Sequence, residues 1–177
     1  MSYRAPVGDI RFILNHVVPM APVSGTARFA EATPDLAEAI LTEAGKLCDT
    51  VLTPVQRNGD MTPALLENGT VRCSPGYIEA FGAIRDGGWV SVSAPAEHGG
   101  MGLPQCLNMA IHDMMSGACL SLQLSPLMTQ GQIEALDHHA SDDLKALYLP
   151  KLISGAWAGT MNLTEAQAGS DVGALRT

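Results

Sequence analysis

The chain has 177 residues, of which 46% are hydrophobic and 16% are charged, a composition typical of a folded globular protein that excludes a disordered one. Its formal net charge of −8 argues against a nucleic acid as partner, because nucleic-acid-binding proteins gather Lys and Arg on one face. No apolar run reaches the roughly 20 residues that span a bilayer, and the N-terminus has no signal-peptide core, so we expect a cytoplasmic protein without a membrane span.

Residues 1–32 are expected to form an N-terminal extension that docks on the rest of the chain. An apolar patch at residues 10–18 supplies its contact surface. Residues 19–25, which contain proline, glycine and serine, have the composition of a linker.

The first long helix is predicted from Thr33 to about residue 52. Thr33 suits an N-cap and Pro34 suits the first helical position. Apolar residues then recur every three or four positions, which gives the helix one apolar face. We expect it to end just before Pro54.

The next stretch, residues 57–73, is rich in turn signals. Asn58-Gly59-Asp60 and Glu67-Asn68-Gly69 are interpreted as turns that flank a short hairpin. A second helix is predicted from Ser74 to Gly87, where glycine favours a C-terminal cap. The glycines of the following loop, residues 93–104, are not a dinucleotide fingerprint, because no strand precedes them and no βαβ unit surrounds them.

Two buried helices are predicted over residues 105–117 and 120–136, with a break near Ser125-Pro126. Both are rich in leucine and methionine. The simplest interpretation is that these side chains form the core. The alternative is that some of them line a ligand pocket, for which flexible methionines are well suited.

A last helix is predicted over residues 144–149, between the capping Ser141 and Pro150. The four cysteines lie far apart and form no C-x-x-C pair, and the adjacent His138 and His139 make a poor metal pair. We therefore expect neither a disulfide framework nor a metal site.

The final stretch, residues 159–177, combines an apolar start with small and polar residues. Residues 161–164 suit an extended segment, and Ala168, Gly169 and Ser170 suit a turn with almost no side-chain bulk. Such a backbone can approach a flat ring closely and donate N–H groups to a phosphate.

Residues 163–171 read Leu-Thr-Glu-Ala-Gln-Ala-Gly-Ser-Asp. They resemble the flavin-binding signature of the acyl-CoA dehydrogenases, Leu-Thr-Glu-Pro-x-Ala-Gly-Ser-Asp, and depart from it only at Ala166. The Pro-x-Glu-x-Gly-Gly-x-Gly-Leu-Pro pattern at 95–104 also fits this family. Residues 3–12 look like the N-terminal extension of one of its longer subgroups, so the resemblance covers nearly the whole chain.

The resemblance implies a mainly α fold. It makes residues 33–156 the N-terminal helical domain of an acyl-CoA dehydrogenase, preceded by the extension at 1–32. Residues 157–177 would then be the start of the middle β-domain, including its first strand, with that domain truncated at the end of the chain.

The same resemblance implies a set of FAD-binding residues. Met161 and Leu163 would lie against the flavin, and the hydroxyl and backbone of Thr164 would bond to the ring. Gly169 and Ser170 would approach the phosphate-bearing region, with the Ser170 hydroxyl reaching either FAD or the CoA part of the substrate. The alternative for Thr164 and Ser170 is that their hydroxyls only cap turns.

Enzymes of this family convert an acyl-CoA to the 2-enoyl-CoA with a glutamate base, pass electrons to an electron-transfer flavoprotein and assemble as homo-oligomers. The base lies in a C-terminal domain, so we expect no catalytic residue in this chain and no activity from it alone. Glu97, Glu134 and Glu165 are interpreted as structural or solvent-facing. The alternative function is a non-catalytic helical module that binds an acyl chain or a partner protein.

Overall fold

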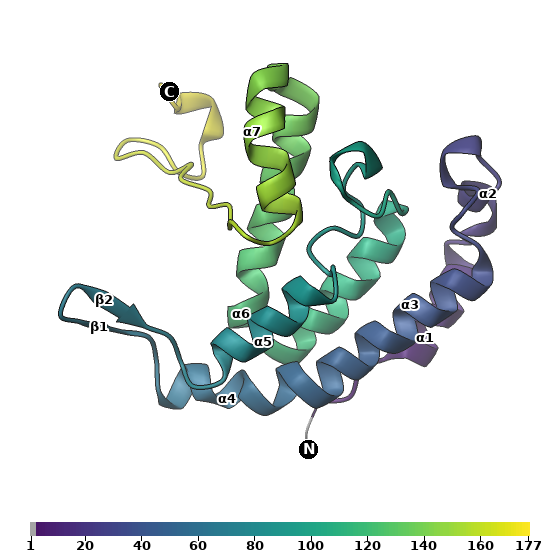
Figure 1. Cartoon of the computed structure of the whole chain (residues 1–177), viewed down its shortest axis with the longest axis horizontal. Helices are drawn as coiled ribbons and strands as arrows, with labels where there is room; N and C mark the ends of the chain where they lie inside the picture. Colours follow the sequence, from purple (N-terminus) through teal and green to yellow (C-terminus); the bar gives the residue numbers. More distant parts are fainter. Residues whose placement is uncertain (1–2) are drawn as a thin grey trace.

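The computed structural model describes residues 3–177, and the predicted mainly α fold is confirmed (Figure 1). The N-terminal extension contains α1 (Val7–Phe12), which continues into a π-helical turn at Ile13–Val17, then α2 (Ala21–Ser24) and a 3-10 turn at Ala27–Phe29. It packs along the next helix and buries Ile10 and Met20.

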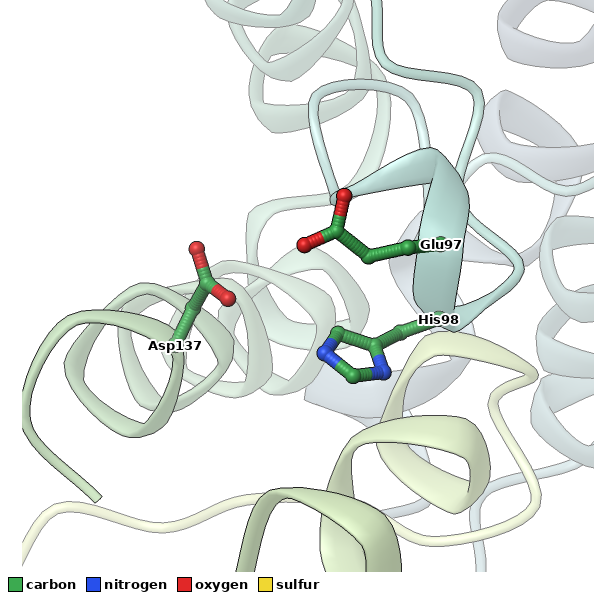
Figure 2. Close-up of side chains that lie close together, drawn as sticks. All are labelled: Glu97, His98 and Asp137. Carbon is green, nitrogen blue, oxygen red and sulfur yellow. The ribbon is translucent and has the colours of Figure 1, made fainter. Parts of the chain in front are cut away.

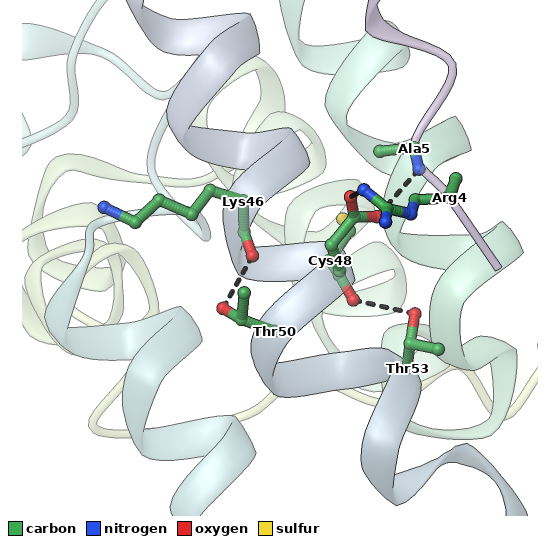
Figure 3. A network of polar contacts seen from close by, with 7 residues as sticks. Arg4, Ala5, Lys46, Cys48, Thr50 and Thr53 are labelled. Atoms are coloured by element: carbon green, nitrogen blue, oxygen red, sulfur yellow. Dashed lines mark hydrogen bonds and ion pairs between the residues drawn. The ribbon is translucent and has the colours of Figure 1, made fainter. Parts of the chain in front are cut away.

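Asp49 holds the start of this extension. Its carboxylate accepts a hydrogen bond of 2.8 Å from the Ala5 N–H and lies 4.0 Å from the Arg4 guanidinium (Figure 3). Further along, Arg11 forms an ion pair with Glu38. The extension is therefore tied to the body of the protein at two points.

Helix α3 (Pro34–Leu47) begins as predicted, and the Thr33 hydroxyl accepts a hydrogen bond of 3.2 Å from the Leu36 N–H. The predicted end before Pro54 is wrong. The helix passes through a π-helical turn at Cys48–Leu52 and continues as α4 (Thr53–Met61). The wide turn accommodates the proline, and the Thr53 hydroxyl donates to the Cys48 carbonyl at 2.8 Å (Figure 3).

A hairpin is present, formed by β1 (Leu65–Glu67) and β2 (Thr70–Arg72), paired antiparallel, but it is built around the second predicted turn and does not lie between the two. Asn68 and Gly69 form its turn with φ of 51° and 78°, as a type I′ turn requires. The predicted turn at residues 58–60 is wrong, because these residues belong to α4. The second predicted helix is α5 (Tyr77–Asp86).

Helix α6 (Gln105–His139) reverses direction at Cys119, whose φ of −158° and ψ of 82° are not helical. The two predicted helices exist as its two arms, but the break near Ser125-Pro126 is wrong. Tyr77 and Ser121 hydroxyls hydrogen-bond at 2.5 Å beside Cys119 and hold the reversal. Pro126 removes only one backbone donor and is accommodated inside the second arm.

Helix α7 (Asp142–Ile153) extends beyond the predicted end and through Pro150. Leu149, Leu152 and Ile153 are buried with Ala94 and Ile133 in a small second core. Burying three such side chains contributes about 1.5–3 kcal/mol each. This outweighs the roughly 3 kcal/mol that a proline inside a helix costs.

The main core lies between α3, α5 and the first arm of α6, with Leu107, Ile111, Met114 and Met115 at its centre. Across residues 3–177, none of the helices combines the length and the apolar character needed to cross a bilayer.

The expected strand at residues 161–164 pairs with no other strand in the described part of the chain. The segment is extended, and Glu165 and Ala168 form an isolated bridge after it. A strand is stabilised by a neighbouring strand that satisfies its N–H and C=O groups, and residues 3–177 supply none here.

Candidate functional site

A groove of about 570 Å³ runs between the second arm of α6 and the segment after α7. One wall comes from the helix and the other from the extended segment; the lining residues are Leu127, Met128, Gly131, Gln132, Ala135, Thr160, Met161, Asn162 and Leu163. Its size is that of small-molecule pockets, and most of its walls are apolar.

Two side chains of α6 hold the extended segment in place. The buried Thr129 hydroxyl accepts a hydrogen bond of 2.9 Å from the Gly159 N–H, and the Gln132 amide donates to the Thr160 carbonyl at 2.5 Å. Thr129 in turn donates to the Ser125 carbonyl at 2.8 Å. The backbone just before Met161 is therefore fixed against the helix.

There is a glycine on each side of this contact, Gly131 on α6 and Gly159 in the segment after α7. A Cβ atom at Gly131 would meet no other atom within 4 Å, so the groove is open above this position. A Cβ atom at Gly159 would lie 2.4 Å from the Gln132 side-chain oxygen. A side chain at residue 159 would therefore displace the Gln132 side chain, which donates to the Thr160 carbonyl.

Met161 and Leu163 line the groove, as two of the five predicted cofactor-binding residues. Their exposed fractions are 68% and 44%, which leaves apolar surface available to a ligand. Thr164, Gly169 and Ser170 do not line this groove but follow it directly in the chain.

Thr164 and Gly169 are brought together by a tight turn. Glu165 and Ala168 exchange backbone hydrogen bonds of 2.8 and 3.2 Å, so the chain doubles back. A Cβ atom on Gly169 would lie 3.3 Å from the Thr164 methyl group. Ser170 is exposed beside them.

This region offers hydrogen-bond donors. Within residues 3–177, the N–H groups of residues 161–164 and of Gly169 and Ser170 donate no hydrogen bond, and neither does the Thr164 hydroxyl. Free donors next to an apolar groove can bind the polar edge of a ring or a phosphate.

Glu165 has a structural role in this turn. Its carboxylate accepts hydrogen bonds from the Thr177 hydroxyl, from the N–H groups of Arg176 at 3.1 Å and Thr177 at 3.0 Å, and from Gln167. These bonds lower the pKa of Glu165 to about 2. A carboxylate with so low a pKa is a poor general base at neutral pH.

A second groove, of about 710 Å³, adjoins the first and shares Gln132 and Ala135 with it. Tyr148 and Trp157 form part of its wall, with ring centroids 5.9 Å apart, and the Lys151 ammonium lies 4.0 Å from the Trp157 ring centroid. The apolar surface thus continues from α6 to α7.

The other acidic candidates lie outside both grooves. Glu134 pairs with His138 at 3.6 Å on the exposed side of α6. Glu97 lies near His98 and Asp137 (Figure 2). Among the described residues that line the first groove there is no carboxylate, so this groove contains no candidate base.

Thr129, Gly131 and Gln132 were missed by reasoning from the sequence. Their signal is the run Thr-Gln-Gly-Gln at 129–132, which interrupts an apolar helix with polar and small residues. Such an interruption indicates that another segment packs on the helix at that point.

The sequence matches the family described as "Acyl-CoA dehydrogenase, N-terminal domain" over residues 34–156. Among individual proteins, it is 46% identical to 3-methylmercaptopropionyl-CoA dehydrogenase of Ruegeria pomeroyi, over 99% of this chain and 30% of that protein. It is 32% identical to a butyryl-CoA dehydrogenase of Syntrophomonas wolfei, over 99% of this chain and 29% of that protein.

A broad-specificity linear acyl-CoA dehydrogenase of Mycobacterium tuberculosis is 29% identical, again over 99% of this chain and 29% of that protein. The chain therefore spans just under a third of the length of these curated relatives.

Proposed function

Because the chain belongs to the acyl-CoA dehydrogenase family, as its N-terminal region, we propose that it contributes to an FAD-dependent enzyme that converts an acyl-CoA thioester to the 2-enoyl-CoA. The observation that supports this most directly is the groove between α6 and residues 160–163. Met161 and Leu163 line this groove, and the donors of Thr164, Gly169 and Ser170 follow it in the chain, which supports a flavin-binding role for this stretch.

Met161 and Leu163 would provide the apolar contact for the flavin ring, since both line the groove and keep exposed surface. The free N–H and hydroxyl of Thr164 would donate to the ring's polar edge. Gly169 and the exposed Ser170 would face the phosphates or the CoA part of the substrate. When bound, FAD supplies the hydride acceptor, and the protein supplies orientation and hydrogen bonds.

The α6 wall would receive the acyl chain. Leu127, Met128 and Ala135 present an apolar surface, and the flexible Met128 can adapt to chains of different shape. The first substrates to test are 3-methylmercaptopropionyl-CoA and butyryl-CoA, because two of the similar proteins are named for them.

We propose that these 177 residues do not catalyse the reaction alone. α-Proton removal needs a carboxylate within hydrogen-bond reach of the substrate, and the residues lining the groove include none. In this proposal the base belongs to another part of the complete enzyme. An electron-transfer flavoprotein as acceptor and a homo-oligomeric complete enzyme belong to the same proposal.

The test measures FAD binding to the purified protein by flavin fluorescence and compares the wild type with two glycine variants. Gly131→Leu should fill the groove and weaken FAD or acyl-CoA binding at least about tenfold, an effect of roughly 1.4 kcal/mol. Gly82→Leu in α5 is the matched control, because a Cβ there also meets nothing within 4 Å and it lies outside the groove. It should bind like the wild type.

Equal binding by wild type and Gly131→Leu would contradict the placement of the ligand in this groove. Binding of an acyl-CoA without any binding of FAD would favour the alternative function, a non-catalytic module for acyl chains.

A further inference from the structure

A cluster of three possible metal ligands lies apart from the grooves. Glu97 and His98 belong to the 3-10 turn Ala96–His98, and Asp137 lies near the end of α6. Each offers one ligand atom, and these atoms all lie within 4.8 Å of one another. The three side chains point toward a common space (Figure 2).

The loop that carries Glu97 and His98 is held by its own backbone. The N–H groups of Met101, Gly102 and Leu103 bond to carbonyls of residues 91–94 at 2.9–3.0 Å. A Cβ atom at Gly100 would lie 2.1 Å from the Ala94 carbonyl oxygen, so only glycine permits this close packing. The two ligands therefore start from a fixed backbone.

The opposite side of the cluster is equally fixed. Asp137 lies one helical turn after Ile133, which is 1% exposed in the second core together with Ala94. Ala94, just before the loop, and Ile133 of α6 thus belong to one packed cluster. Ligands on well-packed elements are preorganised for binding.

The charges of the cluster are not compensated within residues 3–177. None of the side chains of Glu97, His98 and Asp137 takes part in a hydrogen bond or ion pair there. Their ligand atoms are therefore available to a cation.

We propose that Glu97, His98 and Asp137 form a binding site for a divalent transition metal such as Zn²⁺. One imidazole nitrogen with two carboxylate oxygens is a donor set for Zn²⁺ and related ions, whereas Mg²⁺ and Ca²⁺ prefer oxygen alone. Zinc bonds of about 2.0–2.2 Å require donors roughly 3.3 Å apart. The three ligand atoms lie within 4.8 Å of one another, so binding would require these side chains, of which Glu97 is exposed, to rotate toward that separation.

The metal would tie the loop to the end of α6. Because three protein ligands leave a tetrahedral ion one position for water, the site remains open. Its direct effect would be to restrain residues 95–102 against the helix.

The test is isothermal titration of the protein with Zn²⁺. The background is Cys73→Ser, since the exposed thiol of Cys73 would itself bind zinc. His98→Ala and Asp137→Asn should each raise the dissociation constant at least tenfold. His139→Ala, a histidine at the end of the same helix and outside the cluster, should change it less than twofold.

A further variant separates this site from the nearby Glu134–His138 pair. If His138→Ala abolishes Zn²⁺ binding and His98→Ala does not, the proposal is overturned. Absence of Zn²⁺ binding by the Cys73→Ser protein overturns it as well. A second readout is amide hydrogen exchange: Zn²⁺ should slow exchange in residues 95–102, Mg²⁺ should not, and His98→Ala should remove the effect.

Discussion

The Glu165 carboxylate connects the turn at residues 165–168 to residues 176 and 177. Four donors surround it, and its pKa of about 2 lies below the ordinary value of 4.5. A carboxylate whose pKa is lowered in the folded state contributes stability above the ordinary pKa and loses it as the pH falls toward the lowered one. The contacts of this loop should therefore weaken between about pH 4.5 and pH 2.

Glu165→Gln should reproduce this loosening at neutral pH, because an amide attracts the Arg176 and Thr177 N–H groups less strongly than a carboxylate. Exchange of these two amides, measured by NMR, should become faster while the melting temperature stays unchanged. Asp171→Asn is the control, since it removes an exposed charge nearby that forms none of these bonds. Unchanged exchange in Glu165→Gln would contradict the role of this carboxylate.

Ala166 is the position where the motif departs from the family pattern. It is the first of the two residues between Glu165 and Ala168, and within residues 3–177 Asn68 is the one non-glycine residue with positive φ, so Ala166 has a negative φ. Proline is favoured at this position of a type I turn.

Ala166→Pro should therefore be neutral or stabilise the protein by about 0.4–1 kcal/mol, since proline restricts the unfolded chain. Thermal unfolding measures this. Gln167→Pro, at the next position, serves as the contrast and should be destabilising, because proline there forces its neighbour out of the helical region. A clear loss of melting temperature in Ala166→Pro would show that the backbone does not accept proline.

At the scale of elements, predictions succeeded where neighbouring residues decide the structure, and two helix ends placed at prolines failed. Thr33 as a cap, a turn at Asn68–Gly69 and α5 were predicted correctly, because local chemistry decides them. The helix ends placed at Pro54 and Pro150 were wrong, because a π-helical turn and the second core outweigh the local cost. Distant segments decide the structure at Pro150, and an unexpected π-helical turn decides it at Pro54.

In the candidate site, too, residues within one short motif could be predicted from the sequence, whereas contacts between distant residues could not. Met161 and Leu163 were predicted to bind the cofactor from a motif of consecutive residues; both line the groove, and their contact with a cofactor stays a prediction. Thr129 and Gln132 bond to residues 30 and 28 positions away, so the local run at 129–132 can mark a contact on the helix but does not say which segment makes it.

Pro150→Ala should stabilise the protein by about 1–3 kcal/mol, because α7 continues through this exposed position and alanine restores a backbone donor. Pro126→Ala is the contrast. Pro126 is buried in α6, so the substitution also removes packed atoms and should gain less. Chemical unfolding of both variants measures the difference, and destabilisation by Pro150→Ala would contradict this account of α7.

At the scale of the whole molecule, apolar side chains remain exposed on one face formed by α6, α7 and the extended segment. Met161, Leu163, Trp157, Leu127 and Tyr148 are each more than a third exposed. A contiguous apolar surface of this kind marks a contact site. We expect the chain alone to self-associate.

Sedimentation velocity over a range of concentrations measures this association. Leu127→Ser combined with Met161→Ser should shift the protein toward monomer. Leu66→Ser, which changes a leucine that is 73% exposed in the hairpin, should leave the association unchanged. A monomer at high concentration in the wild type would contradict the expectation.

The reversal of α6 at Cys119 also bears on the order in which the chain folds. It brings the Asn108 amide within 2.7 Å of the Gln130 side-chain oxygen across 22 residues, whereas the extension reaches Asp49 across 44. Closing the shorter loop costs less entropy, and local contacts form sooner. The two arms of α6 should therefore associate early, and the N-terminal extension should dock late, onto a surface that already exists.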